Sequence, residues 1–194
     1  MDWLTPEGFA AFTGALVIMR GVAEWWLDQF NVTHIQGHQG KMPPAWKSVI
    51  DASTFSRSVN YTVAKGKFSQ WSGIYGTLIL LAALFSGLLP AMEQKWTGHL
   101  GASIWIQSGF LCTVATLLAL FDLPWNFWSQ FHLEERFGFN KSNRKLWAVD
   151  QLKMFILGWA IGWPMITLLL WIVEKAGDQW WVWAWCVLLV FQIV

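Results

Sequence analysis

The chain has 194 residues, of which 55% are hydrophobic and 13% are charged, and its formal net charge is +1. An average soluble domain carries about 25% charged residues, so this composition excludes an ordinary soluble protein and favours a membrane protein. The balanced charge gives no reason to expect a nucleic-acid partner. The 17 tryptophans also favour a membrane, because the Trp ring prefers the level of the lipid headgroups.

Five apolar runs predict an all-α, multi-pass protein whose first partner is the lipid bilayer. A helix needs about 20 apolar residues to cross the hydrocarbon. The expected spans are residues 8–27, 68–92, 96–121, 154–173 and 179–194. The last run has only 16 residues, so the sequence indicates a chain that stops inside its fifth helix. We therefore expect residues 1–194 to be a membrane domain cut from a longer protein.

The first span contains an acid and a base near its end. Arg20 and Glu24 are four residues apart, which places them on one helical face where they can pair. Such a pair is either an anchor that reaches for the membrane interface or part of a functional relay, and the sequence leaves both open.

The polar segment 28–67 is too long for a passive hairpin. His34 and His38 have the spacing of helical zinc ligands, but no Glu follows His34, and glycines and prolines surround the pair. We therefore expect no metal site there. Beyond Pro43 and Pro44 an approximately helical apolar pattern predicts an interfacial helix. The pattern consists of Trp46, Val49, Ile50 and Phe55.

The segment 131–153 is the longest charged stretch between two apolar runs. Its Glu134-Glu135-Arg136 triplet is followed by Phe137-Gly138-Phe139-Asn140, where Gly and Asn tolerate the positive φ that ends a helix. Asn140 or Ser142 is then expected to cap a new helix that begins near Arg144. Phenylalanines among the charges favour a folded piece packed against the membrane or a partner domain. An ordinary amphipathic loop at the bilayer surface is the alternative.

The fourth span contains Gly158 and Gly162, then Pro164. Small residues four apart allow helices to approach closely in lipid, so we interpret the two glycines as a helix-packing face. Pro164 is expected to bend the helix or free a backbone carbonyl.

The distribution of Lys and Arg predicts the orientation. The segments 28–67 and 131–153 hold most of these residues outside the spans, and the two short turns hold one each. The long-segment residues counted are Lys41, Lys47, Arg57, Lys65, Lys67, Arg136, Lys141, Arg144 and Lys145, against Lys95 and Lys175 in the turns. The long loops are therefore expected to be cytoplasmic and the N-terminus outside.

The sequence contains no recognisable catalytic centre. None of the four histidines belongs to the His-Glu-x-x-His pattern of a zinc protease, and a Gly-x-Ser-x-Gly elbow and a phosphate-binding glycine loop are missing too. We expect no catalytic and no metal-ligating residue in this chain.

Several ordered segments nevertheless resemble the N-terminal membrane half of the CAAX prenyl protease family. They are Pro43-Pro44, the Ile50 to Tyr61 stretch, Phe68 to Tyr75 with Trp71, Leu123-Pro124-Trp125, and Glu134-Glu135-Arg136-Phe137-Gly138-Phe139-Asn140. The chain departs from the family at Phe137, where the family usually has His. The resemblance runs from about Lys41 to the end of the chain.

The resemblance implies an integral-membrane zinc metalloendopeptidase that trims prenylated or other peptides. It also implies a cytoplasmic His-Glu-x-x-His domain beyond Val194, which would be the chain's main partner and would hold the zinc. The membrane helices would form a chamber and brace that domain, and the chain would be inactive alone. The alternative function is a stand-alone, non-enzymatic membrane scaffold subunit of a larger complex. A small transporter is a weaker third reading, because charge within the spans is scarce.

Overall fold

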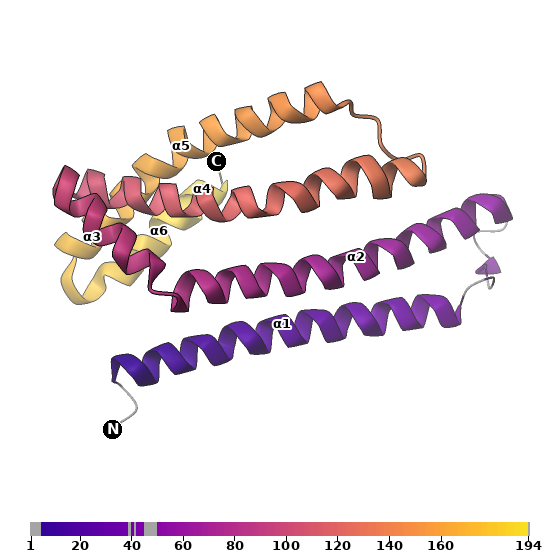
Figure 1. Ribbon diagram of the computed structural model, residues 1–194, viewed down its shortest axis with the longest axis horizontal. Coiled ribbons are helices and arrows are strands. Elements are labelled where there is room, and N and C mark those ends of the chain that lie inside the picture. The colour runs from indigo at the N-terminus through magenta and orange to yellow at the C-terminus, as the bar shows by residue number, and fades with distance from the viewer. Residues whose placement is uncertain (1–4, 39, 41, 45–49, 194) are drawn as a thin grey trace. The chain divides into compact units, whose positions relative to one another are not determined.

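A computed structural model describes residues 5–38, 40, 42–44 and 50–193. All regular structure in these residues is helical (Figure 1). The elements are α1 (Pro6–Gly37), α2 (Ala52–Phe85), α3 (Leu88–Leu100), α4 (Ile104–Trp128), the π-helix η2 (Ser129–Glu134), α5 (Arg144–Lys175), the 3₁₀ turn η3 (Gly177–Gln179) and α6 (Trp180–Ile193). The predicted all-α fold class is confirmed.

The chain divides into two compact units. Unit 1 comprises residues 1–86 and 121–141, and unit 2 comprises residues 87–120 and 142–194. Within the described residues three helical stretches are long and apolar enough to cross a membrane, namely Ala52–Phe85, Ile104–Glu134 and Arg144–Lys175. The apolar side chains on these helices are largely exposed, as for Trp71 at 68% and Phe155 at 48%. An exposed apolar surface of this extent suits a polytopic membrane protein, because lipid covers it.

The helix boundaries differ from the expected spans at two places. The expected turn around Glu93 and Lys95 is instead the short helix α3, which follows a left-handed Gly87 with φ 76°. The expected loop over residues 28–67 is much shorter, because α1 continues to Gly37 and α2 begins at Ala52. Hydropathy marks the part of a helix that suits the hydrocarbon, whereas backbone hydrogen bonds carry the helix on into water.

Only part of the interfacial helix expected after the two prolines falls within the described residues. Trp46 and Val49 lie outside the described residues. Ile50 is not helical, whereas Phe55 lies in the first turn of α2, so Phe55 belongs to the start of the long helix.

Asp51 starts α2 as its N-cap. Its carboxylate accepts from the backbone N–H groups of Ser53 at 3.1 Å and Thr54 at 3.3 Å, and from both of their hydroxyls. These bonds, the Ser53 hydroxyl first, hold the pKa of Asp51 well below its ordinary value. An ionised cap also complements the positive end of the helix dipole.

Unit 1 is built on the close antiparallel packing of α1 and α2 (Figure 1). Glycines permit the approach: a Cβ on Gly21 would lie 2.7 Å from Thr77 Oγ1, and one on Gly66 would lie 2.5 Å from Val32 Cγ2. The amide of Gln70 donates to Gln29 at 2.9 Å and links the same two helices. Arg20 and Glu24 pair along α1 at 2.8 Å, as their spacing predicts.

Unit 2 is held by polar contacts between α4 and α5. Trp159 donates through its indole N–H to the Thr116 hydroxyl at 2.9 Å, and Trp163 donates to the Trp105 carbonyl at 2.9 Å. The buried hydroxyls of Ser108 and Thr167 lie 2.7 Å apart, so one donates to the other. Hydrogen bonds of this kind stabilise helix pairs in lipid, because no water is present there to bond an unsatisfied hydroxyl.

The α1–α2 contact yields the first testable prediction. Gly21→Ala should lower the melting temperature of the purified chain in detergent, because the new Cβ would meet Thr77 and push the helices apart. Gly76→Ala is the matched control, since a Cβ there meets nothing within 4 Å. The control should gain up to about 1 kcal/mol from helix propensity. Equal melting shifts for the two variants would contradict glycine-mediated packing.

Candidate functional site

The Glu134 to Asn140 string forms the end of the helical segment that begins with α4. Phe139 N donates to the Glu134 carbonyl at 2.9 Å, and Gly138 N donates to the Glu135 carbonyl at 3.0 Å. This pair of bonds is a Schellman motif, in which the residue after the helix adopts a left-handed conformation. Gly138 has φ 75°, so the predicted positive φ at this glycine is confirmed.

The next helix is capped one residue later than expected. Asn143 is the N-cap of α5, and its side-chain oxygen accepts from Leu146 N at 2.8 Å. The prediction that Asn140 or Ser142 fills this role is wrong, because only Asn143 directly precedes the first helical residue with an extended backbone. The predicted helix start near Arg144 is confirmed.

Two segments far apart in the sequence meet at this turn. The Tyr61 ring of α2 lies 5.5 Å from the Phe137 ring and 4.7 Å from the Phe139 ring, in edge-to-face arrangements. The Lys65 ammonium lies 5.6 Å from the Tyr61 ring centre, and the Arg136 guanidinium lies 5.7 Å from that of Phe137. We call Tyr61, Phe137, Gly138 and Phe139 the aromatic clasp. It fixes the turn to α2.

A groove of about 780 Å³ lies beside the clasp, between α2 and the segment from Pro124 to Arg136. Its wall is mostly aromatic and apolar, with two cationic side chains. The lining residues are Ala64, Lys67, Phe68, Trp71, Pro124, Trp125, Trp128, Leu133 and Arg136. We call this the aromatic groove.

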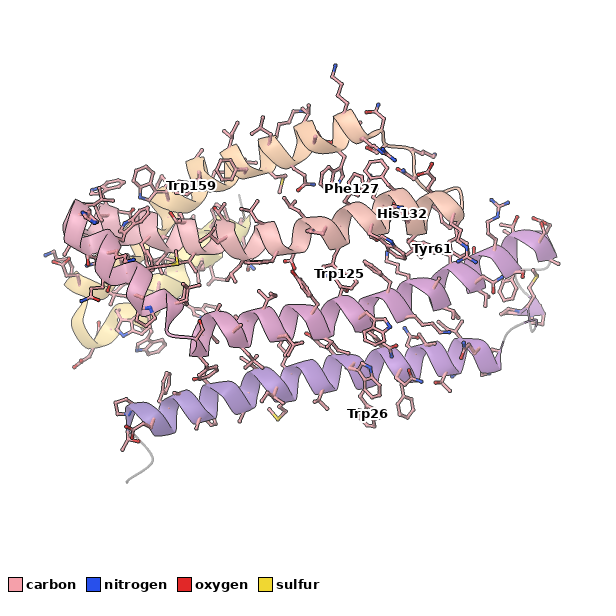
Figure 2. All side chains as sticks on the ribbon, in the orientation of Figure 1. Trp26, Tyr61, Trp125, Phe127, His132 and Trp159 are labelled. Atoms are coloured by element: carbon pink, nitrogen blue, oxygen red, sulfur yellow. The ribbon has the colours of Figure 1, made fainter. Side chains whose placement is uncertain are left out.

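Ring contacts join the two walls of the groove. Phe68 of α2 stacks on Trp128 at 5.1 Å with an interplanar angle of 12°, and lies 5.3 Å from Trp125. Tyr75, two turns further along α2, also contacts Trp125 at 5.5 Å. Figure 2 shows Trp125 extending from α4 toward α2. One end of the groove therefore lies near the clasp at Tyr61, and the other end lies near Trp125 and Tyr75.

The π-helix η2 helps to aim these side chains. Its six residues continue α4 with a wider turn, and Phe131 and Leu133 are buried there. Just before it Trp128 stacks on His132 at 5.7 Å and 9° (Figure 2 labels His132). A π-helix shifts the register of the residues after it, which here include Arg136.

Sequence reasoning identified part of this site. It named Tyr61, Trp71 and Arg136 as family-motif residues, and the structure brings all three to the clasp or the groove. It did not select Lys67 or Trp128 as site residues, although Lys67 directly precedes the uncharged run 68–92, where interfacial side chains are expected. Glu134 and Glu135 contribute backbone carbonyls to the turn.

Other predicted residues lie away from the groove. Pro43 and Pro44 are exposed ahead of α2. A Cβ built on Gly158 or Gly162 meets nothing within 4 Å, so their helix-packing role stays a prediction. Pro164 lies inside α5, which continues as one helix through it.

The residues that the structure describes do not fit a zinc site. Among the residues that the structure describes, no three His, Cys, Asp or Glu side chains gather closely enough to hold a metal ion. His34 and His38 have ring centres 4.4 Å apart, but His38 Nδ1 lies 2.8 Å from the His34 carbonyl and is engaged there.

The left-handed turn yields the second prediction. Gly138→Val should destabilise the chain by about 1–2 kcal/mol, because the side chain of a β-branched residue clashes with its own backbone at positive φ. Gly138→Asn is the matched control, since Asn tolerates this conformation, and it should cost less. Thermal melting in detergent measures both. The nearest atom to a new Cβ is Arg57 Nη1 at 3.7 Å, an ordinary contact, so crowding does not explain a difference. Equal melting temperatures would contradict the left-handed geometry.

Comparison with known proteins identifies the architecture. The family model for the CAAX prenyl protease N-terminal region, with five membrane helices, matches residues 31–194. The chain is 36% identical to CAAX prenyl protease 1 of Saccharomyces cerevisiae over 145 residues, covering 70% of this chain and 32% of that protein. It is 34% identical to the human CAAX prenyl protease 1 homolog over 163 residues, covering 79% of this chain and 34% of that protein. The chain therefore spans about a third of the length of these relatives.

The fold is also that of a solved relative. The crystal structure of Ste24p from S. mikatae superposes with a TM-score of 0.82 at 31% identity, covering 97% of this chain and 44% of that chain. The sequence resemblance and the helical architecture agree. Because the family model matches most of its length, this chain belongs to the CAAX prenyl protease family and corresponds to its N-terminal membrane region.

Proposed function

We propose that residues 1–194 form the membrane domain of an integral-membrane zinc metalloendopeptidase. In this role the helices build the chamber wall and brace a cytoplasmic protease domain that binds the zinc. The substrate of the whole protein is a peptide, prenylated or otherwise. The observation that carries the proposal is the match of residues 31–194 to the N-terminal region of this protease family.

The folded turn within the segment 131–153 supports a bracing role. A passive link between helices needs neither a Schellman turn nor a set of rings packed against a distant helix. Here Tyr61 contacts both phenylalanines that flank Gly138. Such contacts hold the turn in one position, as a docking surface for a further domain requires.

The chain by itself is proposed to be inactive. The described residues offer no set of ligands for zinc and no His-Glu-x-x-His helix. A zinc peptidase needs both, because the metal and a carboxylate together activate the attacking water.

A chimera tests this proposal. Residues 31–194 would replace the matching segment of S. cerevisiae CAAX prenyl protease 1, and cleavage of a prenylated CAAX peptide would be measured in membranes. We expect the chimera to cleave the peptide and the isolated chain to leave it intact. The yeast protein without its matching segment is the negative control.

Two outcomes would contradict the proposal. Cleavage by the isolated chain would disprove its inactivity. A chimera that is inserted, stable and zinc-loaded yet inactive would show that the chain does not support catalysis. That second result, together with co-purification of the chain in a larger complex, would favour the non-enzymatic scaffold.

The orientation is part of the same proposal. The Lys and Arg bias supports a cytoplasmic location for residues 28–67 and 131–153 and an outside location for the N-terminus. In sealed vesicles with the cytoplasmic face inward, cysteines introduced at Lys65 or Lys141 should resist a membrane-impermeant maleimide. A cysteine introduced at Glu7 should react. Labelling of the first two in intact vesicles would reverse the orientation.

A further inference from the structure

We propose that the aromatic groove binds one anionic glycerophospholipid, with the phosphate held by Lys67 and Arg136 and an acyl chain along the aromatic wall. The proposal concerns a lipid that stays bound beside α2. It is separate from the peptide substrate and requires no proteolysis.

The charge of the groove selects an anion. Its nine lining residues include two cations and no acid. In the part of the chain that the structure describes, neither Lys67 nor Arg136 forms an ion pair with a carboxylate. Two unpaired cations beside one cavity form a complementary site for a phosphate.

The groove stands at the level where a phospholipid headgroup lies. Lys67 is the last charged residue before the uncharged run 68–92, which is the second span expected from the sequence. Trp71, Trp125 and Trp128 line the same groove, and Trp favours that boundary. A soluble anion would not need an apolar wall, whereas a phospholipid supplies both a charge and a chain.

The polarity of the groove matches that of a lipid. Arg136 lies beside the aromatic clasp, since its guanidinium faces the Phe137 ring at 5.7 Å. Trp125 lies toward the other end, where it contacts Tyr75 at 5.5 Å. Trp71 is 68% exposed, so the wall offers apolar surface that no described part of the chain covers. A volume of about 780 Å³ holds a headgroup and part of one chain.

The test is a lipid titration of the full chain in neutral detergent, followed by intact-protein mass spectrometry. Phosphatidic acid and phosphatidylserine are the anionic probes, and phosphatidylcholine is the zwitterionic probe. We expect one anionic lipid per chain, bound at least tenfold more tightly than phosphatidylcholine. Lys67→Gln with Arg136→Gln should weaken anionic binding by about tenfold or more, since it removes the two cations that line the groove and would contact the phosphate directly.

The matched control is Lys141→Gln with Lys145→Gln. It removes the same charge from two exposed residues of the segment 131–153, which also contains Arg136, and neither residue lines the groove. This control should retain the wild-type affinity. Trp71→Ala should weaken both lipid classes by a similar factor, because it shortens the apolar wall without changing charge.

Several results would overturn the proposal. They are equal affinity for phosphatidylcholine, equal loss in the control pair, or binding of free phosphate as tight as that of the lipid. A photoactivatable phosphatidic acid serves if the Lys67 and Arg136 variant does not fold. It should label residues 64–71 and 124–136 of the unaltered chain, and labelling elsewhere contradicts the site. Cross-links from Trp71 to a second copy of the chain would show that protein, not lipid, fills the groove.

Discussion

The left-handed Gly138 turn is the constraint on which the packing of the α4 to η2 segment against α2 depends. It ends the α4 to η2 segment and turns the chain so that Phe137 and Phe139 both reach Tyr61 on α2. These contacts fix the segment against α2, and Phe68 and Trp128 then stack at 5.1 Å. The groove and its two cations follow from that register. A residue unable to adopt positive φ would therefore disturb the groove although it does not line it.

The sequence was sufficient for the turn but not for its partner. The Gly in Phe137-Gly138-Phe139-Asn140 follows from local chemistry, because few residues other than Gly and Asn adopt a positive φ. The contact with Tyr61 spans some 76 positions of sequence, and no local pattern specifies it. The π-helix was missed for a related reason. One extra residue in a turn leaves no mark on hydropathy, yet it changes which side chains face α2. The sequence did not single out Asn143 as the N-cap of α5, because Asn140, Ser142 and Asn143 are all residue types that cap helices.

The glycines also show that local sequence does not specify which residues come into contact. The Gly158 and Gly162 pair has the familiar spacing of a packing face, but within the described chain nothing lies within 4 Å of a Cβ built on either. A built Cβ instead meets a facing side chain most closely at Gly21 and Gly66, which sit on different helices and share no spacing rule. A glycine allows two helices to meet, but the facing side chain decides whether they do. Thr77 and Val32 supply that facing surface here.

The lipid surroundings of the helices explain why so few residues are buried. Only six apolar residues form a buried core among the residues described, while the helices carry large exposed rings. In water such a surface would aggregate, but in a bilayer it is already solvated, so the hydrophobic effect does not press these helices together. Specific contacts must then fix their positions. Unit 1 uses glycine contacts and stacked rings, and unit 2 uses Trp and Thr hydrogen bonds such as Trp159 to Thr116 at 2.9 Å. Membrane helices fixed in this way can leave apolar grooves open between them, because lipid fills such a groove, whereas in water the hydrophobic effect would favour closing it.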